Sequence, residues 1–381
     1  MSRWKKIAHR VALRVEEEFE LRKARLREDP TPRAEDIVIV PYRSFGDPSS
    51  LHVRGRVLRD RNISPAGEHE TVWRNMVNVY KRLASDEIPG AMLVAAFRGA
   101  EIEATADEEG YFHFEFPVAL GGAHHGWHEV QLRLADDGDG KTSVAHVLVP
   151  STDAEYGIIS DLDDTVVQTG ATALTSMVRT VLMHNAHTRI PFEGVSAFYR
   201  ALHRGNRGEE LNPIFYVSSG PWNLYDLYAD FLAHQKIPAG PIMLGDYGID
   251  EETFIHDPHD EHKLRGVRGI MNAYPRLRFI LIGDSGQRDP EIYSEVVRQF
   301  PGRVAVVYIR DVTVPERDAV VHSLRDSLRE SGGEMVLVQS SLEAAEDAVG
   351  RGLIPADSLP SIAQEKRIDE AEASDAPLPQ G

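Results

Sequence analysis

The sequence contains no cysteine among its 381 residues. This absence excludes a disulfide framework, a thiolate nucleophile and a cysteine-ligated zinc site, so catalysis would have to use oxygen or nitrogen groups. The chain also lacks an apolar run near the length of a membrane span, and we expect no transmembrane segment. Its basic start, MSRWKKIAHR, leads into the charged EEEFE instead of an apolar stretch, which argues against a cleaved secretory signal. A cytoplasmic location is therefore the expectation.

The sequence also has fewer Lys and Arg than Asp and Glu residues. The formal net charge is −18, which disfavours a nucleic-acid-binding protein because such proteins neutralise phosphates with an excess of Lys and Arg. The charge is distributed unevenly: residues 1–27 carry nine Lys and Arg against four Glu, whereas residues 355–381 carry six Asp and Glu against two Lys and Arg. Pro, Ala and Ser accompany these acidic residues, so residues 355–381 are predicted to be an acidic disordered tail.

Residues 1–29 are predicted to form an amphipathic helix. Apolar side chains recur at three- and four-residue spacings from Trp4 to Phe19, and the pattern stops before Pro30. Two interpretations of the apolar face are open. The favoured one packs this face on the rest of the protein. The other lays it on an anionic membrane with the basic residues turned outward, as a peripheral membrane contact.

The rest of the chain divides into two regions of different pattern. In residues 36–150, short alternating or β-branched runs such as YFHFEF and EVQLRL are separated by Gly, Pro and Asp, which predicts a β-sandwich-like accessory domain. In residues 156–350, compact apolar runs such as YGIIS, PIFYVSS and RFILIG alternate with helical patterns, as in a parallel sheet buried on both faces. The predicted fold class is therefore α/β, with a doubly wound parallel sheet whose site lies at the carboxyl ends of its strands.

Acidic residues follow the first strand of the second region. The segment Asp161-Leu-Asp163-Asp164-Thr165 comes directly after YGIIS. Two carboxylates one residue apart at a strand end point into one crevice, where a cation such as Mg²⁺ must offset their repulsion. A carboxylate can attack phosphorus to give an acyl phosphate, and a neighbouring carboxyl can serve first as acid and then as base. A metal-free Asx-rich turn is the structural alternative.

Two further segments place polar groups near the ends of predicted strands. The predicted strand at residues 213–219 ends in VSSG. There, Ser218 or Ser219 and the backbone N–H groups at the start of the next helix offer a cradle for phosphate. Lys263 lies near the start of a predicted helix at 261–274. It is placed to neutralise phosphoryl oxygens or the nucleophile, although a lone Lys is more often a solvated surface residue.

A third segment, IGDSGQRDPE, again follows an apolar strand. Asp284 ends that strand and is a candidate Mg²⁺ ligand. Asp289 directly precedes Pro290, so it either caps the next helix or supports the metal ligands from outside.

In this order, DxDxT, a strand-end Ser, a Lys and GDxxxxD resemble the four motifs of the haloacid-dehalogenase (HAD) phosphatases. More narrowly, VSSGPWNLYDLYADFL, HKLRGVRGIM, FILIGDSGQRDPEIY and VYIRDV resemble the catalytic domain of the actin-patch-associated phosphatidate phosphatase family. That family also has a β-rich region upstream, so the resemblance covers residues 36–330. It implies a HAD-like Rossmannoid fold for residues 156–350.

The resemblance also implies roles for individual residues. Asp161 would be the nucleophile and a Mg²⁺ ligand, and Asp163 would be the general acid and base and bind the metal through its backbone carbonyl. Ser218 would hydrogen-bond the transferring phosphoryl group, although Ser219 is an alternative for the motif serine. Lys263 would balance the phosphoryl charge, and Asp284 would complete the protein ligands.

The expected function is a Mg²⁺-dependent phosphatase that hydrolyses a phosphomonoester through an aspartyl-phosphate. The favoured substrate is phosphatidate, which would yield diacylglycerol and phosphate. Insertions around the motifs are too short for a large lid domain, so we expect an open site, which suits a phosphate on a bulky partner. The alternatives are a phosphatase acting on a phosphoprotein or soluble phosphomonoester, and a non-catalytic lipid-surface or scaffold module. The presence of Asp163 argues against the last, because a phosphate binder needs no acid or base.

Overall fold

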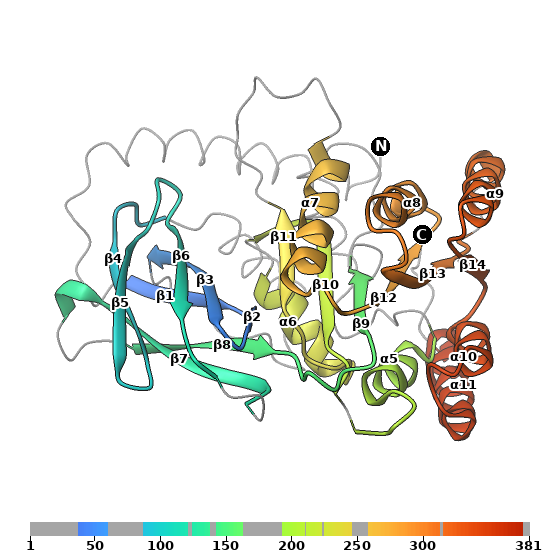
Figure 1. The fold of residues 1–381 in the computed structure, drawn as a ribbon, viewed down its shortest axis with the longest axis horizontal. Helices are drawn as coiled ribbons and strands as arrows, with labels where there is room; N and C mark the ends of the chain where they lie inside the picture. Colours follow the sequence, from blue (N-terminus) through green and yellow to red (C-terminus); the bar gives the residue numbers. More distant parts are fainter. Residues whose placement is uncertain are drawn as a thin grey trace.

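The computed structural model describes residues 37–59, 87–120, 124–137, 142–162, 193–209, 211–222, 225–245, 258–312 and 315–375. These residues form two sheets, one from the N-terminal and one from the C-terminal part of the chain (Figure 1). The predicted helix at residues 1–29 lies outside the described residues. Within the part of the chain that the structure describes, no helix is both long and apolar enough to cross a membrane.

The N-terminal sheet contains eight strands in the described part of the chain. They are β1 (Ile37–Tyr42), β2 (Ser44–Asp47), β3 (Ser50–Arg59), β4 (Met92–Phe97), β5 (Ala100–Thr105), β6 (Tyr111–Pro117), β7 (Gly126–Leu134) and β8 (Thr142–Val149). Their order is β1-β3-β2-β8-β7-β4-β5, and β6 pairs with β3. The pairing is antiparallel except between β2 and β8. A short 3-10 helix, η2 (Ala135–Asp137), follows β7.

Sequence alternation explains how this sheet builds its own apolar core. In β6, Phe112, Phe114 and Phe116 are buried, whereas His113 and Glu115 between them are exposed. Successive side chains of a strand point to opposite faces, so the three Phe rings lie together on the inner face. They join a core that consists of residues from the N-terminal sheet and its loops.

The C-terminal sheet has six described strands, all parallel. They are β9 (Gly157–Asp161), β10 (Ile214–Pro221), β11 (Ile242–Gly245), β12 (Phe279–Asp284), β13 (Val304–Arg310) and β14 (Met335–Val338). Their order is β11-β10-β9-β12-β13-β14. The chain thus builds outward from β9 through β10 and β11 on one side, then returns to add β12, β13 and β14 on the other. The boundary between β9 and β12 is where the strand order reverses, and ligands bind at such a point in open parallel sheets.

Helices cover both faces of the C-terminal sheet (Figure 1). One face carries α7 (Pro258–Ala273), α8 (Asp289–Gln299) and α9 (Pro315–Glu330), and the other carries α5 (Val195–Arg204), α6 (Tyr225–His234), α10 (Ser341–Gly350) and α11 (Leu359–Asp375). A separate apolar core lies under each helical layer. This architecture is a mixed α/β fold with a parallel sheet, consistent with the Rossmann-like class predicted from the sequence.

The C-terminal segment differs from the disordered tail predicted for residues 355–381. A 3-10 helix, η4 (Ala356–Ser358), and helix α11 occupy residues 356–375. Ile362 of α11 is fully buried in the apolar core shared with α5, α6 and α10, Asp369 accepts a hydrogen bond from the Gly194 backbone N–H, and Glu365 pairs with Arg200. The acidic composition indicated disorder, but Ile362 provides an apolar anchor, and α5 provides partners for the acids.

Candidate functional site

The predicted acidic residues meet where the strand order of the parallel sheet reverses. Asp161 is the last residue of β9 and Asp284 is the last residue of β12. These two strands are direct neighbours, with Ser160 paired to Ile282. The topology therefore brings two carboxylates, 123 positions apart in the sequence, to the same edge of the sheet.

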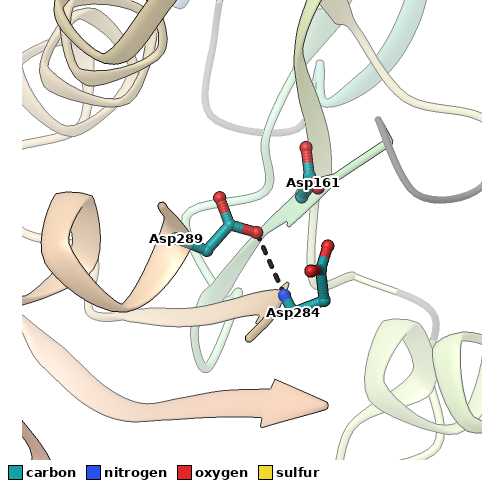
Figure 2. A group of neighbouring side chains, drawn as sticks. All are labelled: Asp161, Asp284 and Asp289. Carbon is teal, nitrogen blue, oxygen red and sulfur yellow. Dashed lines mark hydrogen bonds between the residues drawn. The ribbon is translucent and has the colours of Figure 1, made fainter. Parts of the chain in front are cut away.

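Asp289 and Lys263 complete a buried charged cluster with Asp161 and Asp284. Carboxylate oxygens of the three Asp residues lie within 4.8 Å of one another, and Figure 2 shows their side chains gathered at the strand ends. The Lys263 ammonium, only 2% exposed, lies 2.6 Å from Asp161 Oδ1 and also pairs with Asp289 Oδ1. The other oxygen of Asp289 accepts a hydrogen bond from the Asp284 backbone N–H at 3.0 Å. Asp289 therefore orients both Lys263 and the loop that carries Asp284.

The electrostatics of this cluster depend on its burial. Burial raises the pKa of Asp289 above its ordinary value, because the charged form loses solvation, while the Lys263 ammonium acts in the opposite direction. A buried carboxylate is tolerated only when paired, so Lys263 stabilises the ionised state of its two partners. Gly283 makes the close approach possible: a Cβ there would lie 2.2 Å from Asp289 Oδ2.

The donor set fits a hard divalent cation. Mg²⁺ prefers carboxylate and carbonyl oxygens, and the cluster of Asp161, Asp284 and Asp289 offers carboxylate oxygens from three sides. Asp284 is held in place because its Oδ1 accepts hydrogen bonds from the backbone N–H groups of Gly286 (2.7 Å) and Gln287 (3.0 Å). Both carboxylate oxygens of Asp289 are engaged, Oδ1 by Lys263 and Oδ2 by the Asp284 backbone N–H, so Asp161 and Asp284 are the better candidates for direct ligation.

The two candidate serines differ in burial. Ser218 is fully buried, and its hydroxyl donates to Tyr228 Oη on α6 at 3.1 Å and accepts from the Gly220 backbone N–H at 2.8 Å. Ser219 is half-buried. Because the Ser218 hydroxyl is engaged by Tyr228 and by the Gly220 backbone, the Ser219 hydroxyl is the better candidate to contact a phosphoryl group.

This geometry predicts different effects for the two serines. Ser219→Ala should lower kcat/KM by about 10²–10³-fold, the usual effect of removing one donor to a transition-state oxyanion. Ser218→Ala should instead lower the free energy of unfolding by about 1 kcal/mol through its lost hydrogen bonds, with a smaller effect on turnover. Steady-state kinetics and melting temperatures of both variants check this. A larger kinetic loss in Ser218→Ala would assign the phosphoryl contact to Ser218.

The structure adds residues to the site that the sequence analysis did not identify. The Ser160 hydroxyl donates to the Asp161 backbone carbonyl at 2.9 Å, so Tyr199 Oη, at 2.7 Å from Ser160 Oγ, acts as the donor to Ser160. Tyr199 is on α5, and this chain of hydrogen bonds fixes the backbone at the end of β9. A Tyr among other apolar helix residues has no pattern that distinguishes such a role from ordinary core packing.

Arg317 is a second residue found only in the structure. From α9, its guanidinium donates to both carboxylate oxygens of Glu291 at 2.9 and 2.8 Å, and to the Ser285 backbone carbonyl at 3.0 Å. Ser285 directly follows Asp284, and Glu291 lies two residues after Asp289. Arg317 thus links the loop after Asp284 to the first turn of α8, with Nε donating to Ser285 and Nη2 to the Glu291 carboxylate. The remaining predicted site residue, Asp163, lies outside the described residues.

Comparison with known proteins identifies the region that carries this cluster. Residues 156–311 match the family model of the catalytic domain of phosphatidate phosphatase APP1. The matched range contains Asp161, Lys263, Asp284 and Asp289. The predicted resemblance to the catalytic domain of the phosphatidate phosphatase family is thereby confirmed for residues 156–311.

The individual relatives agree with this match. The chain is 29% identical over 217 residues to "Phosphatidate phosphatase APP1" of Saccharomyces cerevisiae, covering 55% of this chain and 36% of that protein. It is 28% identical over 218 residues to an uncharacterized protein of Schizosaccharomyces pombe, covering 56% of this chain and 35% of that protein. The chain thus spans about a third of the length of these curated relatives. The solved structure of a carbohydrate acetylesterase from Xanthomonas citri aligns with 90% of this chain and 77% of the esterase chain, at 11% sequence identity. The TM-score of 0.32 is too low for this likeness to support a conclusion.

Proposed function

We propose that the protein is a Mg²⁺-dependent phosphatase of the HAD superfamily that hydrolyses phosphatidate to diacylglycerol and phosphate. The observation that carries the proposal is the buried cluster of Asp161, Lys263, Asp284 and Asp289 at the strand-order reversal, inside the region similar to an APP1 catalytic domain. Three carboxylates and one ammonium have little structural advantage over apolar packing at this place, because buried ion pairs seldom increase stability. They are suited to an anionic substrate that arrives with a divalent cation.

The proposed reaction begins with attack of an Asp161 carboxylate oxygen on the substrate phosphorus. The bond from phosphorus to the leaving alcohol oxygen breaks, and that oxygen takes a proton from Asp163. Water then attacks the aspartyl-phosphate, Asp163 accepts its proton, and the bond to Asp161 breaks to release phosphate. Lys263 and the Ser219 hydroxyl stabilise the phosphoryl oxygens during both steps. When bound to Asp161 and Asp284, Mg²⁺ supplies the positive charge that lets a carboxylate approach an anionic phosphate.

The space around the carboxylates favours a substrate whose bulk stays outside the sheet. A cavity of about 90 Å³ adjoins Asp161 and Asp284, and its wall is mostly apolar, with Phe198, Tyr308 and Val338 among the lining residues. It is smaller than a cavity of about 150 Å³, which accommodates benzene. An acyl chain therefore does not fit in this cavity, so the phosphate of a lipid would reach Asp161 with its acyl chains outside the cavity. A membrane contact through residues 1–29 and a cytoplasmic location stay predictions.

A panel of phosphate esters tests the substrate class. Phosphate release should be fastest with phosphatidate in mixed micelles and slower with lysophosphatidate, a phosphopeptide and glucose 6-phosphate. Asp161→Asn serves as the control for contaminating phosphatases, since it keeps the size and fold of the chain. Preference for the phosphopeptide or the sugar phosphate would replace the lipid by a phosphoprotein or soluble phosphomonoester. Absence of release from every member of the panel with Mg²⁺ present would favour a non-catalytic module.

A further inference from the structure

A tyrosine of the N-terminal sheet is packed into the core of the C-terminal sheet. Tyr42, the last residue of β1, is 4% exposed and belongs to the apolar cluster of α5, α6, α10 and their strands instead of its own sheet's core. Its ring stacks on Trp222, with centroids 4.3 Å apart and planes 17° apart, and contacts Tyr225 at 4.6 Å. The next residue, Arg43, donates its backbone N–H to Tyr225 Oη at 2.6 Å.

Both partners of Tyr42 lie in or next to residues 218–222, where β10 ends, which we call the serine turn. Trp222 comes three residues after Ser219 in the segment Ser218-Ser219-Gly220-Pro221-Trp222. Tyr225 is the first residue of α6, and one helical turn later Tyr228 Oη accepts the hydrogen bond from Ser218. Two sets of contacts therefore hold the described residues of this region: Ser218 bonds to Tyr228 of α6, and Trp222 and Tyr225 contact Tyr42 and Arg43 of the N-terminal part of the chain.

We propose that Tyr42 is a positioning residue through which the N-terminal sheet holds the serine turn in its phosphoryl-binding geometry. This inference rests on the proposed function, because it assigns the turn to phosphoryl binding. A flat ring stacked on Trp222 restricts the indole to one orientation, and the indole in turn restricts the backbone that follows Ser219. The N-terminal sheet lies outside the region that matches the catalytic family, residues 156–311, yet it would set the shape of that region's site.

The same interface supplies a matched control at a greater distance from the turn. Phe45 of β2 packs edge-on against Phe215, with centroids 5.6 Å apart at 89°, and contacts Tyr274 at 5.9 Å. Phe215 lies four residues before Ser219 in β10. A strand rises about 3.3 Å per residue, so the two residues are about 13 Å apart. Phe45→Ala therefore removes an aromatic contact between the two sheets without touching the serine turn.

The experiment compares Tyr42→Ala and Phe45→Ala with the conservative variant Tyr42→Phe, and uses Tyr42→Leu as a second variant without the ring. Hydrogen exchange is followed in peptides that span residues 217–225, together with kcat/KM on phosphatidate and the melting temperature. We expect exchange in this segment to become at least about tenfold faster in Tyr42→Ala, because local openings of the turn become more frequent. The same variant should lose about 10–100-fold in kcat/KM, the scale of a small misplacement at a site. Tyr42→Phe should match the wild type in both measurements.

Phe45→Ala is expected to lower the melting temperature with little change in the exchange of residues 217–225. Equal acceleration in Tyr42→Ala and Phe45→Ala, or none in Tyr42→Ala, would overturn the proposal. If Tyr42→Ala fails to fold, Tyr42→Leu keeps the apolar volume without the stacked ring and gives the same test. A wild-type protein without phosphatase activity would reject the proposed function, and the exchange comparison would still decide whether Tyr42 holds the turn.

Discussion

Replacing Asp161 by Asn is expected to lower phosphatase turnover by at least about 10³-fold, the scale seen when a catalytic nucleophile is removed. An amide has nearly the same size as the carboxylate but cannot form the aspartyl-phosphate. Lys263 lies 2.6 Å from Asp161 Oδ1 and loses this charged partner in the variant. The fold should persist because Lys263 keeps its ion pair with Asp289. The loss therefore belongs to chemistry and not to unfolding.

The measurement combines turnover with direct detection of the intermediate. Acid quenching of a reaction with labelled substrate should trap a phosphoprotein in the wild type and none in Asp161→Asn. Asp153→Asn is the matched control, because Asp153 is an exposed carboxylate shortly before the start of β9, at the end of the strand away from the site. It should label and turn over like the wild type. A labelled Asp161→Asn protein with near-normal turnover would show that another residue is the nucleophile.

Removal of the metal is expected to have an effect of similar size. Chelation should abolish turnover and readdition of Mg²⁺ should restore it, because Asp161 and Asp284 repel an anionic phosphate unless a cation lies between them. Asp284→Asn should weaken Mg²⁺ binding by about 10²-fold or more. Losing a residue that only supports the ligands typically costs 10–100-fold, and loss of a direct ligand should cost more. The Gly286 and Gln287 N–H groups can still donate to the Asn carbonyl oxygen, so the loop should keep its shape.

Thermal unfolding gives a readout of metal binding that does not depend on activity. A ligand that binds only the folded state at about 100 times its Kd adds about 2.7 kcal/mol to the free energy of unfolding. Mg²⁺ should therefore raise the melting temperature of the wild type and of Asp318→Asn, which removes an exposed carboxylate on α9. It should have little effect on Asp284→Asn at the same concentration. Full turnover in excess chelator, or an equal rise in melting temperature for Asp284→Asn, would contradict the assignment.

Local pattern was sufficient to predict the strands and the positions of the main carboxylates. Compact apolar runs predicted β9, β10 and β12 because strands buried on both faces need apolar side chains at every position. Asp161 and Asp284 each end such a run, and parallel strands end at a common edge. Their meeting could therefore be anticipated from the sequence.

Composition was a less reliable guide where a few contacts decide the outcome. Residues 356–375 have the acidic, Ala- and Ser-rich composition of a disordered segment, yet they form η4 and α11. The contacts of Ile362 and Asp369 with the α5 layer stabilise this helix. Average composition does not report whether one apolar residue has a pocket to fill, because that pocket is built by distant parts of the chain.

By itself, the sequence predicted the type of chemistry: oxygen ligands and a carboxylate nucleophile at the ends of parallel strands, with a lysine on a helix. Tertiary structure alone decided which groups touch, because contacts between residues far apart depend on how helices and strands pack. It placed Lys263 between Asp161 and Asp289, and it directed Ser218 toward Tyr228. It also inserted Tyr42 into the catalytic core, a contact across 180 residues of sequence that no local periodicity encodes.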